Sequence, residues 1–149
     1  MPHHHETRQL PHSAAQMYAL VADVGRYPEF LPWNSAARIR SRYPIDGGEV
    51  LEVDLVISFK LFREKFGSRV VLCPEQGRIE TEYLDGPLKQ LKSVWLFRDL
   101  ASGGSEVDFT VDFEFRNPIL ASVIGLVFNE AMTRIVRAFE TRAKAIYAD

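Results

Sequence analysis

The chain has 149 residues and a formal net charge of −2, which favours one domain over residues 1–149 and excludes a generally basic nucleic-acid binder. Hydrophobic residues make up 46% and charged residues 26%, the usual balance of a globular domain with its own core. Cys73 is the only cysteine, so an internal disulfide is excluded, as expected in a reducing compartment.

The first part of the chain predicts a strand followed by two short helices. Residues 3–10 read as the strand, and Ser13 with Gln16 three residues later forms the sequence pattern of a capping box at a helix start. A second short helix or turn is expected over 27–31. The Pro-Trp-Asn segment 32–34 then reads as an exposed loop.

A run of strands separated by tight turns follows. Turn signals at 46–48 (Asp-Gly-Gly) and 85–87 (Asp-Gly-Pro) separate segments rich in alternating apolar residues. Tight turns join antiparallel neighbours, and strands grouped together with helices outside the run indicate the α+β class. We expect strands over 36–44, 49–59, 62–72, 78–84, 88–99 and 107–115.

The last strand and the segment after it carry the clearest pattern. Odd-numbered residues from Val107 to Phe115 are all apolar, and the intervening residues are polar, so one face of the strand is expected to be buried. Asn117 can cap the next helix, and Pro118 suits its first turn. This helix is expected to run for about thirty residues, and its first half, 119–128, is apolar nearly all round. A curved sheet with an aromatic inner face and one long apolar helix predicts a cavity for a hydrophobic small molecule.

This order of elements resembles the helix-grip fold of the START and Bet v 1-like superfamily. In that fold a curved antiparallel sheet of about seven strands, with two short helices after the first strand, grips a long C-terminal helix. Four segments resemble the coenzyme Q-binding protein family, whose bacterial relatives include ribosome-association toxins. They are YPEFLPWNSAARI (27–39), DGPLKQLKSVWLF (85–97), VDFEFRNPILASVIG (111–125) and AFETRA (138–143). Asn34 stands where that family often has cysteine, so no role for a thiol is expected there.

The resemblance implies non-enzymatic binding of ubiquinone or another polyprenyl quinone in a hydrophobic tunnel, in support of respiratory electron transport. Two alternatives stay open. One is a ribosome-association toxin-like protein that binds the large ribosomal subunit and blocks subunit joining. The other is a polyketide cyclase or aromatase, because an apolar pocket of this fold can shape a substrate with few polar groups. Ubiquinone would be a bound ligand, and no other cofactor is expected.

Alternation and the resemblance together define the expected ligand site. The aromatic residues could instead form an ordinary hydrophobic core. Segment 30–33 could instead be a hydrophobic plug that packs under the rim of the sheet. Tyr83, Lys89 and Lys92 are candidates for polar contacts with a quinone ring. The residues expected to line the site are Phe30, Leu31, Trp33, Leu55, Ile57, Phe59, Trp95, Phe97, Phe109, Phe113, Leu120, Ile124 and Phe128.

Charged residues point to no catalytic or metal centre. All histidines lie within the first twelve residues, and no nucleophile elbow, phosphate loop or dinucleotide fingerprint occurs. A basic face is expected on two strands, either as a solvated surface or as a site for anionic lipids or ribosomal RNA; its residues are Arg38, Arg40, Arg42, Arg63, Lys65 and Arg69. No DNA partner is expected.

The sequence predicts no membrane span and no targeting segment. The apolar run 119–128 is too short to cross a bilayer, because Asn129 and Glu130 interrupt it. The chain begins in strand-like residues, so we expect no signal or transit peptide. These features predict a cytoplasmic location, with peripheral contact at the inner face of the membrane as an open alternative.

Overall fold

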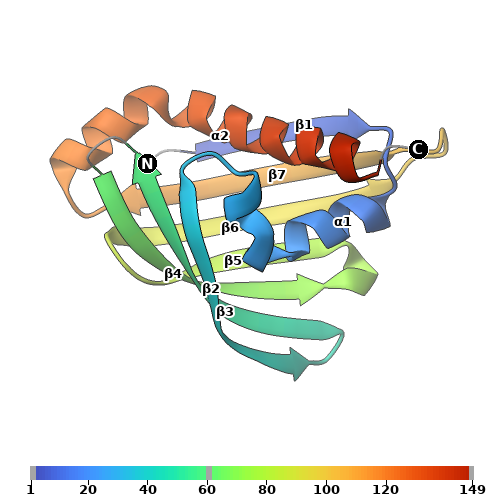
Figure 1. Ribbon diagram of the computed structural model, residues 1–149, viewed down its shortest axis with the longest axis horizontal. Helices are drawn as coiled ribbons and strands as arrows, with labels where there is room; N and C mark the ends of the chain where they lie inside the picture. Colours follow the sequence, from blue (N-terminus) through green and yellow to red (C-terminus); the bar gives the residue numbers. More distant parts are fainter. Residues whose placement is uncertain (1–2, 60–61, 148–149) are drawn as a thin grey trace.

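The computed structural model describes residues 3–59 and 62–147. In this part of the chain a seven-stranded sheet is accompanied by two α-helices and two short 3₁₀ helices (Figure 1). The elements are β1 (His3–Leu10), α1 (Ala14–Ala22), η1 (Val24–Glu29), β2 (Asn34–Ile45), β3 (Gly48–Phe59), β4 (Phe62–Cys73), η2 (Pro74–Gln76), β5 (Arg78–Asp85), β6 (Leu88–Asp99), β7 (Ser105–Phe115) and α2 (Pro118–Ile146).

The sheet is antiparallel throughout, in the order β1-β7-β6-β5-β4-β3-β2. Helix α2 packs against β1, β7 and α1, and Figure 1 shows it running along the β1–β7 side of the sheet. This arrangement confirms the expected α+β class and helix-grip architecture. The described helices include none long and apolar enough to cross a membrane.

Both helix starts follow the local sequence signals. The Ser13 hydroxyl accepts a hydrogen bond from the Gln16 backbone N–H at 3.1 Å, and the Gln16 side chain accepts one from the Ser13 N–H at 3.0 Å. At α2, the Asn117 side-chain oxygen accepts a hydrogen bond from the Ile119 N–H at 2.8 Å. These caps satisfy N–H groups that a helix start leaves without partners, so the predicted boundaries are confirmed.

Segment 32–34 differs from the expected exposed loop. Asn34 is buried and already begins β2, opposite Ile57 of β3. Trp33 is half-buried and adopts a left-handed backbone conformation with φ of 65°, and its carbonyl accepts a hydrogen bond from the Ser58 N–H at 2.7 Å. This turn and its hydrogen bond to β3 hold the segment against the sheet, which short-range sequence signals do not reveal.

The arginines of β2 do not share one face as expected. A bulge between Ile39 and Ser41 shifts the alternation, so that Arg38 stands opposite Asp54, whereas Arg42 stands opposite Leu51. The strict two-residue period used for the prediction fails wherever a bulge inserts an extra residue.

Arg40 of β2 lies at this bulge and connects its strand to β3 and β5. Its guanidinium donates hydrogen bonds to Asp54 of β3 at 2.8 Å and to Asp85, the last residue of β5, at 3.0 Å. Gly67 of β4 leaves the space for this contact, because a Cβ at that position would collide with the guanidinium. The predicted basic surface is therefore partly neutralised by its own carboxylates.

Replacing Asp54 by asparagine is expected to lower the melting temperature at neutral pH but not in acid. Hydrogen bonds from Arg40 hold the pKa of Asp54 below its ordinary value of 3.8. A lowered folded-state pKa contributes stability above the unfolded-state pKa and loses it as the pH falls through the folded-state value. The gap in melting temperature between D54N and the wild type should therefore close below about pH 4.

Thermal unfolding of both proteins across this pH range measures the effect. The control is Glu82→Gln, a more exposed carboxylate 3.7 Å from Arg69, for which the gap should be small at every pH. If the melting temperature of D54N stayed below that of the wild type in strong acid, the destabilisation would come from altered packing rather than from the lost charge.

Candidate functional site

An aromatic cluster connects α2 to the sheet, to η1 and to the residue that follows η1. Trp95 of β6 stacks on Phe109 of β7 with ring centroids 4.2 Å apart, and Phe139 of α2 meets Trp95 edge-on at 5.2 Å. Phe139 also contacts Phe30 at 5.3 Å and Tyr27 at 5.4 Å. These distances are those of favourable aromatic pairs. The cluster fixes the C-terminal half of α2 over one end of the sheet.

The other predicted aromatic site residues are packed in the same core. Phe97 lies 6.1 Å from Trp95, and it contacts Tyr18 of α1 at 5.5 Å. Phe113 contacts Phe128 of α2 at 4.5 Å. Trp95, Phe97, Phe109, Phe113 and Phe128 are all buried, so they form core in this structure. Their contact with a ligand stays a prediction.

A row of half-buried apolar side chains crosses the inward face of β3 to β6. This inward row consists of Leu55, Phe66, Tyr83 and Leu91. Leu55 stands opposite Phe66, and Leu91 stands opposite the buried Phe113 of β7. Farther along β3 the same face carries Leu51 and Val53, which are fully buried. Helix α2 packs against β1 and β7, whereas the inward row lies on the strands beyond them. The row is therefore apolar surface that is incompletely covered.

Asn34 is a buried polar residue on the same face as the inward row. Asn34 is only 7% exposed and stands opposite Ile57. Ile57 is half-buried and lies on the same face of β3 as Leu55, two residues before it. Its side-chain oxygen has no hydrogen-bond partner among the described residues. A buried acceptor without a donor costs free energy, so this position favours a ligand or water that donates a hydrogen bond.

The predicted polar contacts are distributed differently. Tyr83 belongs to the inward row, where its hydroxyl accepts a hydrogen bond from the Leu88 N–H at 2.9 Å. Lys92 stands opposite Asp112 on the outer face, and Lys89 lies 3.9 Å from Glu114. Only Tyr83 of these three therefore lies on the inward face.

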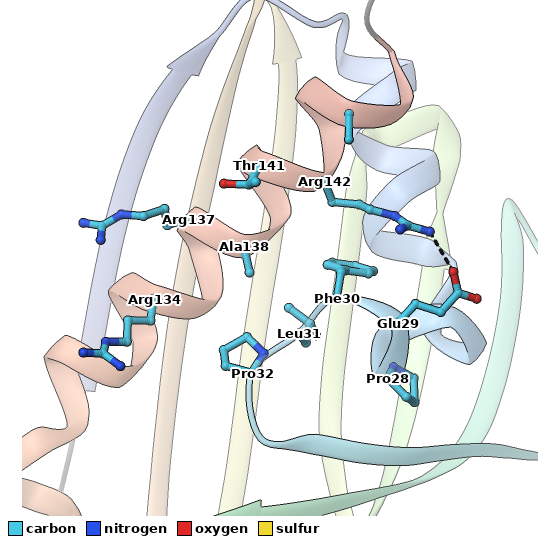
Figure 2. A pocket seen from close by; sticks show the side chains of 11 residues that line it. Pro28, Glu29, Phe30, Leu31, Pro32, Arg134, Arg137, Ala138, Thr141 and Arg142 are labelled. Atoms are coloured by element: carbon cyan, nitrogen blue, oxygen red, sulfur yellow. Dashed lines mark hydrogen bonds and ion pairs between the residues drawn. The ribbon is translucent and has the colours of Figure 1, made fainter.

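Phe30 and Leu31, predicted as a lip of the site, line an open groove between their segment and α2 (Figure 2). This arginine groove has a volume of about 610 Å³, and its apolar floor is bordered by cations from α2. The Arg142 guanidinium donates a hydrogen bond to Glu29 at 2.7 Å and lies 5.2 Å from the Phe30 ring centroid. The other lining residues are Pro28, Pro32, Arg134, Arg137, Ala138, Thr141 and Ala145.

A second open groove of about 700 Å³ lies at the start of α2. Phe115, Ala121 and Phe128 contribute apolar surface to it, and Lys89 and Arg116 contribute charge. Phe128 of the predicted site lies at the base of this groove and is itself only 4% exposed. The side chains of three other predicted site residues lie outside the described part of the chain: Phe59, Leu120 and Ile124.

A polar ladder joins the edge strand β1 to α2. Glu6 binds His4 at 2.9 Å and also pairs with Arg8, and Arg8 in turn binds Glu140 of α2 at 2.8 Å. Burial works to raise the pKa of Glu6, but hydrogen bonds from His4 and Arg8 outweigh it and leave the pKa lowered. Charges that point inward from an edge strand hinder pairing with another sheet.

The remaining chemistry of β1 lies on its outer face. His3 pairs with Asp112 and His5 pairs with Asp108 of β7. Within residues 3–59 and 62–147 no three histidine, cysteine or carboxylate side chains come together as a metal site. His3, His4 and His5 thus contact carboxylates of the sheet, whereas the His12 ring lies 5.8 Å from that of Tyr147.

Comparison with known proteins identifies relatives over the whole chain. A family model described as polyketide cyclase / dehydrase and lipid transport matches residues 10–140. The ribosome association toxin RatA of Escherichia coli K12 is 37% identical over 148 residues, which cover 99% of this chain and 90% of that protein. The mitochondrial coenzyme Q-binding protein COQ10 homolog B of Xenopus laevis is 31% identical over 146 residues, covering 95% of this chain and 58% of that protein.

Solved structures share the fold at lower sequence identity. A START superfamily protein from Mycobacterium smegmatis superposes with a TM-score of 0.81 at 19% identity, covering 97% of this chain and 98% of that one. The Zhui aromatase/cyclase from a Streptomyces species gives a TM-score of 0.82 at 18% identity, covering 96% and 93%. At these identities the likeness concerns the fold alone.

Proposed function

The chain belongs to the polyketide cyclase / dehydrase and lipid transport family, together with the ribosome association toxins and coenzyme Q-binding protein homologues, and on this premise we propose that it binds a polyprenyl quinone. Ubiquinone is the proposed ligand, carried without chemical change in support of respiratory electron transport. The inward row is the observation that supports this function, because it presents apolar surface on four strands that the core does not fully bury.

An isoprenoid tail suits this surface. Each Å² of apolar area removed from water contributes about 25 cal/mol, and the tail would cover Leu55, Phe66 and Leu91 along its length. The quinone ring would lie toward Asn34, whose side-chain oxygen has no partner among the described residues and would accept a hydrogen bond from a hydroxyl of the reduced, quinol form. Such a site is mostly apolar, with few polar groups that orient the ligand.

Protein purified under mild conditions from a quinone-producing host is expected to retain a polyprenyl quinone. Native mass spectrometry followed by identification of the released lipid measures this directly. An unrelated protein of similar size, purified in parallel, controls for lipid carried over from membranes. A lipid signal no higher than that of the control protein would contradict the proposed function.

A second candidate function is binding to the large ribosomal subunit. It is favoured by the 37% identity to RatA over 99% of the chain. Arg38 and Lys65 are exposed, so replacing both by glutamine should weaken association strongly while leaving the Arg40–Asp54 hydrogen bonds in place. Sedimentation of ribosomes after overexpression measures it, and an unchanged ratio of free subunits to joined ribosomes would exclude this function.

A further inference from the structure

The outward face of α2 is unusual for a helix on a globular domain. Ile119 is 75% exposed and Leu126 is 86% exposed, while residues 118–129 contain no charged side chain. Large aliphatic side chains at this exposure contribute nothing to the core. Single exposed apolar residues are common, but these two lie on one face of an uncharged stretch of helix, which favours a contact surface there.

The same face turns basic toward the end of the helix. One line along the helix contains Ile119, Leu126, Arg137 and Lys144. Their successive spacings of 7, 11 and 7 residues are each a whole number of helical turns to within about 20°, so the four residues share a face. Arg134, Arg137 and Lys144 are exposed on the described part of the helix, and Figure 2 shows the two arginines beside the arginine groove. Two carboxylates border this stretch: Glu130 lies 3.3 Å from Arg134, and Glu140 is paired with Arg8 of β1.

We infer that this face docks on a lipid bilayer that carries anionic headgroups. The outward face combines aliphatic side chains at one end with an excess of cations at the other, and this combination matches the hydrocarbon boundary and the negative surface of such a membrane. A nucleic-acid partner would match the cations but not the exposed Leu126 and Ile119. The inference goes beyond quinone binding and does not depend on it.

The arginine groove extends this surface. Its floor at Phe30 and Leu31 is apolar, and Arg134 and Arg137 border it, so a headgroup phosphate can meet the guanidinium groups while acyl chain covers the floor. Arg116 is also exposed just before α2 begins and adds a cation beside the aliphatic end. The docked protein would therefore lie with α2 along the membrane plane.

Flotation with phosphatidylcholine vesicles, with and without phosphatidylglycerol, tests this docking. The wild type should partition onto the anionic vesicles and much less onto the neutral ones. R134Q/R137Q should weaken anionic binding roughly 25-fold, about fivefold for each lost charge. I119Q/L126Q should weaken it at least about tenfold.

Two control variants carry substitutions of the same kinds on the outer face of the sheet. R38Q/K92Q removes two exposed charges, and L96Q removes an exposed leucine that stands opposite Asp108. Both control variants should bind vesicles as the wild type does. Absence of wild-type binding, or equal losses in the control variants, would overturn the inference.

If the protein did not bind vesicles but associated with ribosomes, and the α2 variants abolished that association, the face would be assigned to the ribosome instead. A protein without bound quinone that still binds vesicles would separate this inference from the proposed function.

Discussion

Replacing Phe139 by alanine is expected to lower the free energy of unfolding by about 3–5 kcal/mol. The ring is 3% exposed and contacts Trp95 of the sheet, together with Phe30 and Tyr27 of the segment around η1. Its removal leaves a cavity where three parts of the fold meet. For a domain of this size the melting temperature should fall by roughly 10 °C. Urea unfolding followed by tryptophan fluorescence measures the loss, because Trp95 is in direct contact.

Leu126→Ala is the matched control, since it shortens an apolar side chain of the same helix. Leu126 is 86% exposed, so the free energy of unfolding should change by no more than about 0.5 kcal/mol. A loss below about 1 kcal/mol in F139A would mean that the helix is held mainly by its polar ladder to β1. The comparison thus separates apolar packing from the Arg8–Glu140 contact as the force that holds α2.

The elements that the sequence predicts well are those governed by local rules. The strand over residues 3–10 agrees with β1, and the buried face of β7 agrees residue by residue, with Val107 to Phe115 only 5–8% exposed at the odd positions. Alternation and capping depend on neighbours within about four residues, so a single sequence contains them. The fold class follows because the order of strands and turns limits the topologies.

The site is less accessible from sequence because it depends on register between strands. Phe66 joins the inward row only because β3 pairs with β4 so that it faces Leu55. Phe139 lies in a helical stretch whose pattern does not distinguish it from other core positions. The bulge at Arg40 reverses the expected face of Arg42, and no local signal marks it. Sequence therefore predicts which residues are apolar, but not which of them remain partly uncovered.

Space along the inward row is the physical condition for a carrier, and Leu55→Trp tests it. An indole at this half-buried position should occupy the region that the isoprenoid tail needs, so retained quinone should fall at least about tenfold. If the row borders free space, the free energy of unfolding should change by less than about 1 kcal/mol. If the row is already closely packed, the larger side chain should cost about 1–3 kcal/mol through overpacking.

Two measurements on one variant therefore distinguish a binding site from a core. Quinone content is measured by mass spectrometry, and stability is measured by urea unfolding of the lipid-free protein. Leu96→Trp is the control, because Leu96 is 37% exposed on the outer face and should alter neither quantity. Normal quinone content in L55W would place the ligand elsewhere. A destabilised L55W protein together with a lipid-free wild type would identify the row as core and remove the basis for a carrier, because a tail cannot enter a region that side chains already fill.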